Sequence, residues 1–313
     1  MFKKILMLDF KESSLNQPYW DRFNKLCEQK ILLPRDSPDI ENHLDADCLL
    51  VNFLPVVDKE KIDSMTNLKY IGIMATGYGR IDHTHARTKS IPVCNIPGYS
   101  TESVAEFGFA VILEHLRELE KGKSRVREGK CSEDGFSAVE LKGKVFGILG
   151  LGNIGKRIAE IALGFGCDVR YWSKHRKSEY ESKGIKYQEA DSLIQECNII
   201  SLNLALNKET ENFLNSEKMN KIKTGTIILN LAPMELLDIE TLKQRITKGE
   251  LSIILDHTDE MKPELCKELG NHKNCILYPP IAYISKEASI NKQEIFVSNL
   301  EKFLTNTPKN IVN

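Results

Sequence analysis

One short segment of the chain spaces its glycines in a way that suits phosphate binding. Gly150-Leu151-Gly152-Asn153-Ile154-Gly155 follows an apolar run and opens a segment in which Ile158, Ile161, Ala162 and Phe165 recur at helical spacing. In this setting the first glycine permits a tight turn, the second lets the backbone approach a pyrophosphate, and the third lets helix and strand pack closely. Unpaired N–H groups at the helix start would bind the phosphates. The segment therefore predicts a dinucleotide site, in preference to a glycine-rich turn without a ligand.

The end of the next expected strand bears on which dinucleotide binds. Ser173 stands 18 residues after Gly155, where an NAD site would carry an Asp or Glu for the adenosine ribose. The turn continues instead with Lys174, His175 and Arg176. Cations and a hydroxyl suit the 2′-phosphate of NADP, and Arg can bind phosphate through two hydrogen bonds. The turn favours NADP(H); the alternative is an exposed basic turn with NAD(H) as the cofactor.

Two side chains that exchange protons follow later apolar runs. His257 comes directly after the run 252–256, and Tyr278 comes directly after 275–277. Open α/β sheets bind ligands at the carboxyl ends of their strands. His titrates near neutral pH and Tyr can donate a hydrogen bond, while Glu260 or Asp259 could orient the His. Each is a candidate catalytic residue, and the competing interpretation for each is a packed or solvated side chain.

Alternating elements must position these residues. Short apolar runs at 4–8, 48–52, 70–74 and 92–95 predict strands separated by helical or polar segments. A long helical pattern begins near Ser103. The alternation then restarts with strands expected at 145–149, 168–172, 198–202, 226–230, 252–256 and 275–277. Such repetition predicts an α/β fold of two doubly wound parallel-sheet domains.

Composition excludes several classes of function. Lys and Arg number 43 against 44 Asp and Glu, so no net field attracts nucleic acid or an anionic membrane. No uncharged stretch approaches the ~20 apolar residues of a spanning helix, and the apolar start of the chain stops at Asp9, too soon for a secretory signal. The eight cysteines show no spacing typical of zinc and suit a reducing cytoplasm. We expect a cytoplasmic enzyme or binding protein with no metal.

Longer motifs carry a resemblance to a known family. The segment from Leu141 to Gly155, reading LKGKVFGILGLGNIG, resembles the cofactor segment of the D-isomer-specific 2-hydroxyacid dehydrogenases. The segments 76–82 (TGYGRID), 91–98 (IPVCNIPG), 206–210 (LNKET) and 225–230 (GTIILN) are similar as well. The closing segments 299–304 and 308–313 also resemble that family, so the similarity covers nearly the whole chain.

This resemblance implies an architecture and a set of contacts. It implies two Rossmann-like domains with a cleft between them: a substrate domain of residues 1–100 plus 284–313, and an NAD(P)-binding domain of residues 101–283. It also implies a homodimer and a small-molecule substrate of anionic character, held by backbone N–H groups of Ala75, Thr76 and Gly77. The residues expected at the cofactor are Thr76, Gly150, Gly152, Asn153, Ile154, Gly155, Ser173, Lys174, Arg176, Leu204, Leu231, Ala232, Pro233, Asp256 and Pro280.

The family's catalytic positions hold different residues in this chain. The Arg expected in an Asn-x-x-Arg-Gly segment is replaced by Pro233, and the His of a Pro-His-x-Ala segment is replaced by Pro280. The family Glu falls on Met261 without a gap and on Glu260 with a one-residue deletion. Proline supplies no charge, no proton and no N–H donor, so the usual 2-oxoacid chemistry is not expected.

Two hypotheses follow. The first is an NAD(P)-dependent oxidoreductase that acts on an atypical hydroxy or oxo substrate with His257, Tyr278 and Glu260 as its catalytic residues. The second is a catalytically inactive NAD(P)-binding sensor or interaction protein, since a fold does not fix a function. The intact glycine motif favours the first, and the two prolines favour the second.

Overall fold

The computed structural model describes residues 1–313 and divides the chain into two compact units. Unit 1 comprises residues 1–100 and 285–313, and unit 2 comprises residues 101–284. The boundary between unit 2 and the returning C-terminal segment lies one residue beyond the expected position. None of the helices combines length with the apolar character that crossing a bilayer demands.

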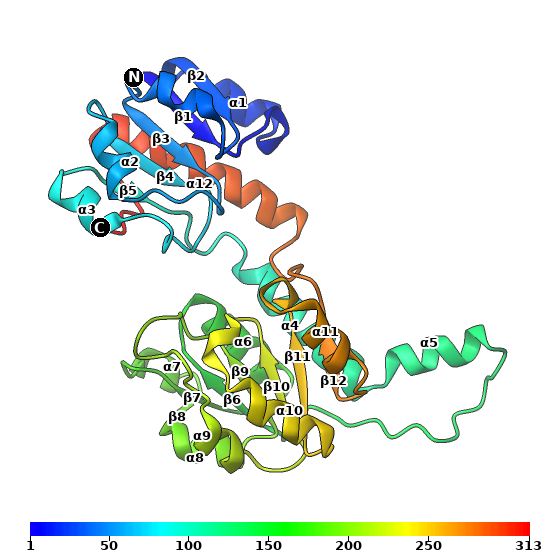
Figure 1. Ribbon diagram of the computed structural model, residues 1–313. Helices are drawn as coiled ribbons and strands as arrows, with labels where there is room; N and C mark the ends of the chain where they lie inside the picture. Colours follow the sequence, from blue (N-terminus) through cyan, green and yellow to red (C-terminus); the bar gives the residue numbers. More distant parts are fainter. The chain divides into compact units, whose positions relative to one another are not determined.

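Unit 1 is a five-stranded parallel sheet in the order β2-β1-β3-β4-β5 with helices packed against it (Figure 1). Its strands are β1 (Phe2–Leu8), β2 (Cys27–Leu33), β3 (Cys48–Val51), β4 (Tyr70–Ile73) and β5 (Val93–Cys94). Its helices are α1 (Gln17–Phe23), α2 (Lys59–Ser64), α3 (His83–Thr88) and α12 (Lys286–Leu304), with 3-10 turns at Glu12–Ser14 and Pro38–His43.

Strand β2 was absent from the sequence-based prediction. Glu28, Gln29 and Lys30 interrupt its apolar run, so no buried pattern marks it. The structure explains this composition because β2 lies at the edge of the sheet and is only partly covered, pairing with β1 alone. Edge strands tolerate charged residues that a central strand would exclude.

Unit 2 is a seven-stranded parallel sheet in the order β12-β11-β10-β9-β6-β7-β8. Its strands are β6 (Val145–Leu149), β7 (Asp168–Trp172), β8 (Lys186–Tyr187), β9 (Ile199–Leu202), β10 (Thr226–Asn230), β11 (Leu251–Leu255) and β12 (Cys275–Leu277). Its helices are α4 (Thr101–Leu116), α5 (Leu119–Arg127), α6 (Asn153–Gly164), α7 (Ser178–Glu181), α8 (Ala190–Glu196), α9 (Ser216–Lys221), α10 (Ile239–Thr247) and α11 (Pro263–Gly270), with 3-10 turns at Met234–Leu236 and Thr258–Glu260.

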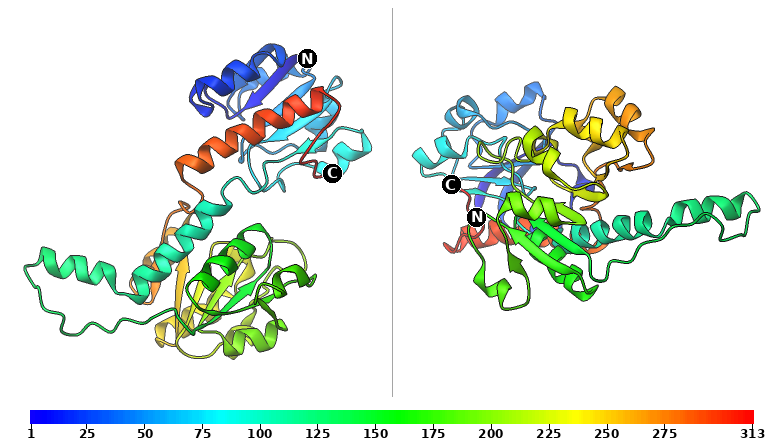
Figure 2. Two further views of the ribbon diagram at one scale, coloured as in Figure 1. Left: turned by 180° about the vertical axis from the view of Figure 1, so that it is seen from behind. Right: turned by 90° about the horizontal axis from the view of Figure 1, so that it is seen from below.

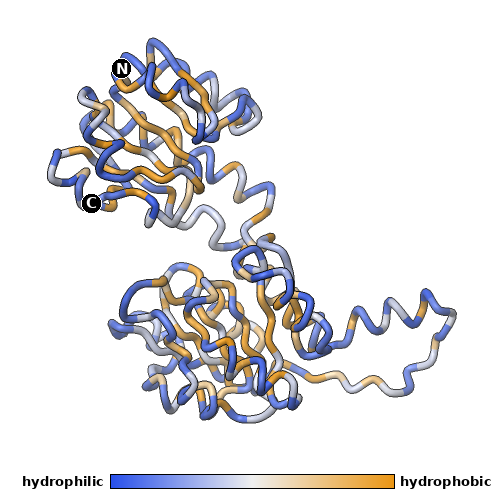
Figure 3. The backbone as a smooth tube through the Cα atoms, viewed as in Figure 1, coloured by the Kyte–Doolittle hydropathy of each residue, from blue (hydrophilic) through white to orange (hydrophobic).

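The prediction of two parallel-sheet α/β domains is confirmed. Apolar residues concentrate on the strands at the centre of each unit, and polar residues dominate the outer helices (Figure 3). In unit 2 the core forms two clusters, one including Phe146 and Ile158 and the other including Leu193 and Ile253. Both clusters hold the strands rigid, so the residues that follow each strand end start from fixed positions.

Within unit 2, the segment after helix α4 extends away from the sheet. Both views in Figure 2 show α5 and the loop that follows it projecting as an arm before the chain returns to β6. Leu119, Val126 and Val139 on this arm are 49%, 63% and 40% exposed. These apolar side chains lack a covering element within the chain.

Candidate cofactor site and catalytic residues

All strands of unit 2 run in the same direction, so their carboxyl ends share one edge of the sheet. Strand β6 pairs with β9 on one side and β7 on the other, and the strand order reverses at this point. A doubly wound sheet binds its ligand at such a reversal. Of the residues predicted at the cofactor, those in unit 2 follow β6, β7, β9, β10, β11 and β12, whereas Thr76 follows β4 in unit 1. The edge therefore brings together residues that lie far apart in the sequence.

The glycine segment has the geometry that its spacing predicts. Gly150 adopts a φ of +96°, and a Cβ atom there would lie 2.7 Å from the carbonyl oxygen of Asn203. At Gly155 a Cβ atom would collide with the carbonyl oxygen of Gly150. At Gly152, by contrast, nothing lies within 4 Å. Gly150 and Gly155 are thus required by the fold, while the space beside Gly152 is open for a ligand.

Helix α6 begins at this open space. Gly152 is its N-terminal cap residue and has no side chain to bind the free N–H groups of the first turn. Those N–H groups, at the positive end of the helix dipole, are suited to a phosphate. The side-chain oxygen Oδ1 of Asn203 is buried without a hydrogen-bond donor beside the same loop. An open cradle and an unpaired buried acceptor fit a dinucleotide.

Asn203 was missed by the sequence analysis, which singled out only its neighbour Leu204. Leu204 itself would be 3.0 Å from a Cβ atom on Gly150, so it lines the same turn. Asn203 follows strand β9, which pairs with β6 through Leu202 and Leu149. Its position after a strand adjacent to the glycine segment was the signal that could have identified it.

The turn after β7 is basic, as the sequence indicates, but its Lys174 and Arg176 side chains are already paired with carboxylates. Arg176 binds Glu181 at 2.6 and 2.7 Å, and Lys174 forms an ion pair with Glu209. The hydrogen bond from Arg176 lowers the pKa of Glu181. The hydroxyl of Ser173 donates to the carbonyl oxygen of His175 at 2.6 Å. A 2′-phosphate would have to replace these carboxylates as the partner of the cations.

The residues after β10 and β11 meet at the same edge. The backbone N–H of Met234, next to Pro233, donates to Oε2 of Glu260 at 3.1 Å. His257 Nδ1 lies 3.5 Å from the other carboxylate oxygen of Glu260. The side chains of Glu260 and His257 therefore lie together beside Pro233.

The pKa of the Glu260 carboxylate is raised above its ordinary value. Desolvation raises the pKa of Glu260, while the N–H of Met234 and the charge of His257 act in the opposite direction. Met261, the other residue at which the family Glu could fall, packs its side chain against the second core cluster. Glu260, and not Met261, reaches the strand edge.

Asp256, which was predicted at the cofactor, binds backbone N–H groups of the protein. Its side chain is 2% exposed, and Oδ1 accepts hydrogen bonds from the backbone N–H groups of Ile281 and Ala282 at 2.9 and 3.1 Å. Burial raises the pKa of Asp256, and these two N–H donors oppose the shift. Asp256 thereby holds the segment that contains Pro280 against the end of β11.

Tyr278 points to a helix. Its hydroxyl donates to Oε2 of Glu114 on α4 at 2.8 Å, and its ring packs edge-on against Phe107. Burial and the Glu114 carboxylate raise the pKa of Tyr278 to about 12. A hydroxyl that already donates to a carboxylate is poorly placed to protonate a substrate. No pattern in the sequence marks Glu114 as its partner.

The strand end after β10 also carries the predicted residues Leu231 and Ala232. Both are buried, at 9% and 7% exposure, and the N–H of Ala232 donates to Oδ1 of Asn230 at 3.1 Å. Pro233 then opens the 3-10 turn Met234–Leu236. These small and apolar residues form a fixed backbone at the edge and carry no charge.

The predicted substrate loop lies in unit 1, after strand β4. Ala75 accepts a hydrogen bond from the N–H of Ile96, and the carbonyl of Thr76 accepts one from Asn95 Nδ2 at 2.7 Å. The N–H groups of Thr76 and Gly77 donate to no group of the protein. The loop is thus anchored through its carbonyls, and its N–H groups remain available.

Comparison with known proteins agrees with this geometry. Residues 109–282 match the family described as D-isomer specific 2-hydroxyacid dehydrogenase, NAD binding domain. The chain is 34% identical over 279 residues to a hydroxypyruvate reductase of Blautia hydrogenotrophica, covering 86% of this chain and 85% of the relative. The chain belongs to the D-isomer specific 2-hydroxyacid dehydrogenase family.

Other members of the comparison extend over most of the chain. A glyoxylate reductase of Thermococcus litoralis is 32% identical over 283 residues, covering 88% of this chain and 86% of the relative. The structure of an acyclic imino acid reductase in complex with NADPH and D-arginine aligns with a TM-score of 0.86 and 25% identity, covering 99% and 100% of the two chains. The D-lactate dehydrogenase of Aquifex aeolicus, complexed with NAD and lactic acid, aligns with a TM-score of 0.84 and 27% identity, covering 97% and 96%.

Proposed function

We propose that this chain is an NAD(P)H-dependent reductase that works without the family's Arg and His. In this proposal Pro233 and Pro280 occupy those two positions, and His257 with Glu260 takes over the proton chemistry. The observation that carries it is the meeting of His257, Glu260 and the Met234 N–H at the strand edge that also bears the glycine cradle.

The chain's residues suggest a division of labour. A bound reduced nicotinamide would supply the hydride. The N–H of Met234 fixes one oxygen of Glu260, and the other oxygen faces His257 Nδ1. Glu260 thereby orients His257, which would act as the proton donor to a substrate atom that gains negative charge. We leave Tyr278 outside the catalytic pair because its hydroxyl is bonded to Glu114.

The experiment is a fluorescence titration of the protein with NADPH and NADH, followed by a panel of 2-oxoacids, aldehydes and ketones with absorbance of the reduced cofactor as readout. We expect His257→Asn to lower kcat/KM by about 10²–10⁴-fold, the usual contribution of a general acid. Cofactor affinity should be unchanged. His272→Asn, a histidine of the same unit outside the site, is the matched control.

Three results would decide between the hypotheses. Oxidation of the reduced cofactor that is abolished in His257→Asn supports His257 and Glu260 as the catalytic pair. Oxidation that survives this substitution contradicts the assignment. Cofactor binding with no oxidation anywhere in the panel supports the alternative of a cofactor-binding sensor.

We propose NADP(H) as the preferred cofactor, with NAD(H) as the alternative. Support comes from the cations of the 173–177 turn and from the NADPH complex of the imino acid reductase. Arg176→Gln should weaken NADPH binding about tenfold or more, the effect of losing a charged hydrogen bond, and leave NADH binding unchanged. Lys183→Gln, which removes a cation paired with Glu160, is the control. Equal losses for both cofactors would contradict the preference.

A second candidate substrate class is an imine, favoured by the loss of the Arg and by the imino acid reductase among the similar structures. An imine nitrogen is far more basic than a carbonyl oxygen, so it can take a proton from His257 without a guanidinium to polarise it. The resulting cation would lie near the Glu260 carboxylate. NADPH oxidation that requires both an oxoacid and an amine would identify this class.

We further propose a cytoplasmic homodimer. The exposed apolar residues of the α5 arm give the dimer a contact surface, and all eight cysteines are free thiols, as a reducing compartment permits. Light scattering of the intact chain and of Val126→Asp tests the assembly. A monomer in the intact chain would contradict it.

A further inference from the structure

Unit 1 contains a cavity of about 530 Å³ at the carboxyl edge of its own sheet. Its walls come from the segments that follow β2, β3 and β4. In this unit the strand order reverses between β1 and its two neighbours, β2 and β3. The cavity thus occupies the edge at which doubly wound sheets bind small molecules.

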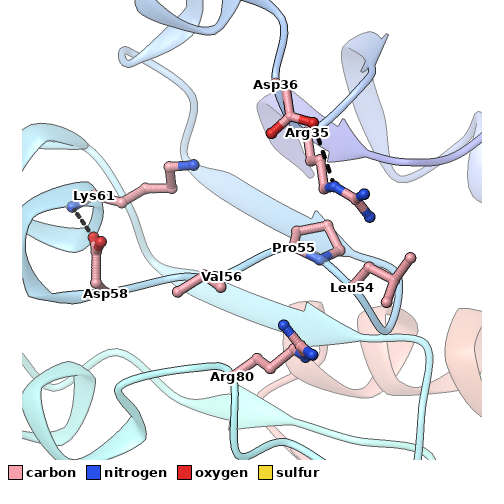
Figure 4. Close-up of a pocket in the computed structure, with 8 residues that line it drawn as sticks. All are labelled: Arg35, Asp36, Leu54, Pro55, Val56, Asp58, Lys61 and Arg80. Carbon is pink, nitrogen blue, oxygen red and sulfur yellow. Dashed lines mark hydrogen bonds and ion pairs between the residues drawn. The ribbon is translucent and has the colours of Figure 1, made fainter. Parts of the chain in front are cut away.

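Three cationic side chains approach this cavity from separate segments. Arg35 follows β2, Lys61 lies on α2 and Arg80 follows the substrate loop after β4, as Figure 4 shows. Sequence separation makes this convergence a property of the fold. A cavity with three cations is suited to an anion with more than one oxygen.

Two of these cations have no acidic partner. Neither Lys61 nor Arg80 forms an ion pair, whereas Arg35 pairs with Asp9 at 3.3 Å and Asp36 at 3.4 Å. The nearest carboxylate to Lys61 in sequence, Asp58, accepts the backbone N–H of Lys61 and caps α2. The two acids that line the cavity, Asp36 and Asp58, therefore form no ion pair with Lys61 or Arg80.

Three apolar residues also line the cavity. Pro55 is buried, while Leu54 and Val56 are 49% and 51% exposed beside it. Large exposed side chains of this kind, next to unpaired cations, suit a ligand with a carbon body and a charged end.

The cavity is linked to the predicted substrate loop through one aromatic ring. The Phe53 ring is 52% exposed and lies 3.6 Å from a Cβ atom built on Gly77. The Arg80 guanidinium lies 5.9 Å from the centre of the same ring. Phe53 therefore forms a continuous surface from the free N–H groups of the loop to the guanidinium.

We propose that this cavity binds a phosphate or carboxylate group of the substrate through Arg80 and Lys61. The substrate would then carry a second anionic group, which Arg80 and Lys61 bind. Calling the ligand a substrate rests on the proposed function, but anion binding by the cavity does not.

The first test measures binding with the full chain by calorimetry, using inorganic phosphate and succinate as probes. We expect saturable binding, reduced about tenfold or more in Arg80→Gln and in Lys61→Gln. Arg87→Gln on α3, which removes an exposed cation of the same unit, should bind as the unmodified chain does. The stronger of the two probes identifies the anion as phosphate or carboxylate. No saturable binding, or equal losses in all three variants, would overturn the proposal.

The second test separates this proposal from the proposed function. NADPH titration of the same three variants should give unchanged cofactor affinity. Among the compounds that the protein reduces, Arg80→Gln should raise KM for dianionic compounds and leave KM for monoanionic compounds unchanged. If Arg80→Gln loses anion binding but the unmodified chain oxidises NADPH with no compound, the cavity is an anion site and the proposed reductase function is refuted. An Arg80→Gln variant that changes KM by the same factor for both substrate classes would refute the assignment of the anion to the substrate.

Discussion

At the scale of single residues, burial decides which groups of this chain are reactive. Six of the eight cysteines are buried, Cys266 is half-buried, and Cys131 alone is exposed; the buried ones are Cys27, Cys48, Cys94, Cys167, Cys197 and Cys275. Burial raises the pKa of Cys167 to about 11 and that of Cys275 to about 12. Since the thiolate is the nucleophile, these thiols are shielded both by access and by protonation.

A thiol reagent should therefore modify one cysteine rapidly in the folded protein. We expect Cys131→Ser to abolish the fast phase of labelling, while denaturation exposes all remaining thiols. Mass spectrometry after brief alkylation identifies the site. A fast phase that persists in Cys131→Ser would show that a second thiol is accessible.

The buried carboxyl of Asp256 gives a pH dependence with a definite sign. Its pKa is raised above the ordinary value of 3.8, so ionisation is harder in the folded than in the unfolded chain. The stability that the protonated form contributes is complete below about pH 4 and declines as pH rises through the folded-state pKa. The Asn side chain of Asp256→Asn retains an acceptor for Ile281 and Ala282 but cannot ionise.

We accordingly expect the Tm difference between Asp256→Asn and the unmodified chain to shift in favour of the variant from pH 4 to pH 7. Thermal unfolding without cofactor at several pH values provides the measurement. Glu211→Gln, at an exposed position of the same unit, serves as control. A difference that moves in the opposite direction would contradict the role of burial.

At the scale of elements, the glycines of the segment differ in role: Gly155 is required for packing within the fold, and Gly152 leaves space for a ligand. Gly155 faces the Gly150 carbonyl across the contact between α6 and its strand, so a methyl group there cannot be accommodated without a shift. Gly152 faces open space at the start of α6 and has an ordinary φ of −81°. Substitution by Ala should therefore lower the stability of the protein at Gly155 and weaken cofactor binding at Gly152.

Gly155→Ala should destabilise the protein by about 1–3 kcal/mol, the usual cost of overpacking. Gly152→Ala should change stability by less than about 0.5 kcal/mol but abolish measurable NADPH binding, because its methyl group enters the phosphate cradle. Chemical denaturation and cofactor titration of both variants test this contrast. Retained binding in Gly152→Ala would contradict the placement of the dinucleotide.

The sequence predicted this part of the molecule well because local pattern determines it. Apolar runs located β6 and β10, and the glycine spacing located the turn between β6 and α6. Strand β2 escaped prediction because an edge position relaxes the apolar pattern. Arg176 pairs with Glu181, and Tyr278 with Glu114, through side-chain contacts between separate segments. Sequence spacing does not encode such contacts, so these partners could not be foreseen.

At the scale of the whole molecule, each unit holds a self-contained set of contacts. The glycine cradle, the 173–177 turn and the His257–Glu260 pair all lie within residues 101–284. The anion cavity lies within unit 1. Binding of a cofactor and binding of an anion are therefore properties that can be measured separately.

A fragment of residues 101–284 should fold and bind NADPH, since it has its own core and the complete cradle. We expect its affinity to be within tenfold of that of the full chain, a difference below about 1.4 kcal/mol. Calorimetry on the purified fragment tests this expectation. A folded fragment that does not bind NADPH would show that unit 1 supplies essential cofactor contacts.

Helix α12 imposes an order on biosynthesis. It lies at the end of the sequence, yet its Phe296 and Phe303 stack on Phe10 and Phe2 of unit 1. Residues 1–100 therefore emerge from the ribosome well before the helix that covers them, and unit 2 can fold in the interval. Until α12 emerges, Phe2 and Phe10 lack these aromatic partners, and the nascent chain exposes apolar surface of the kind that favours aggregation.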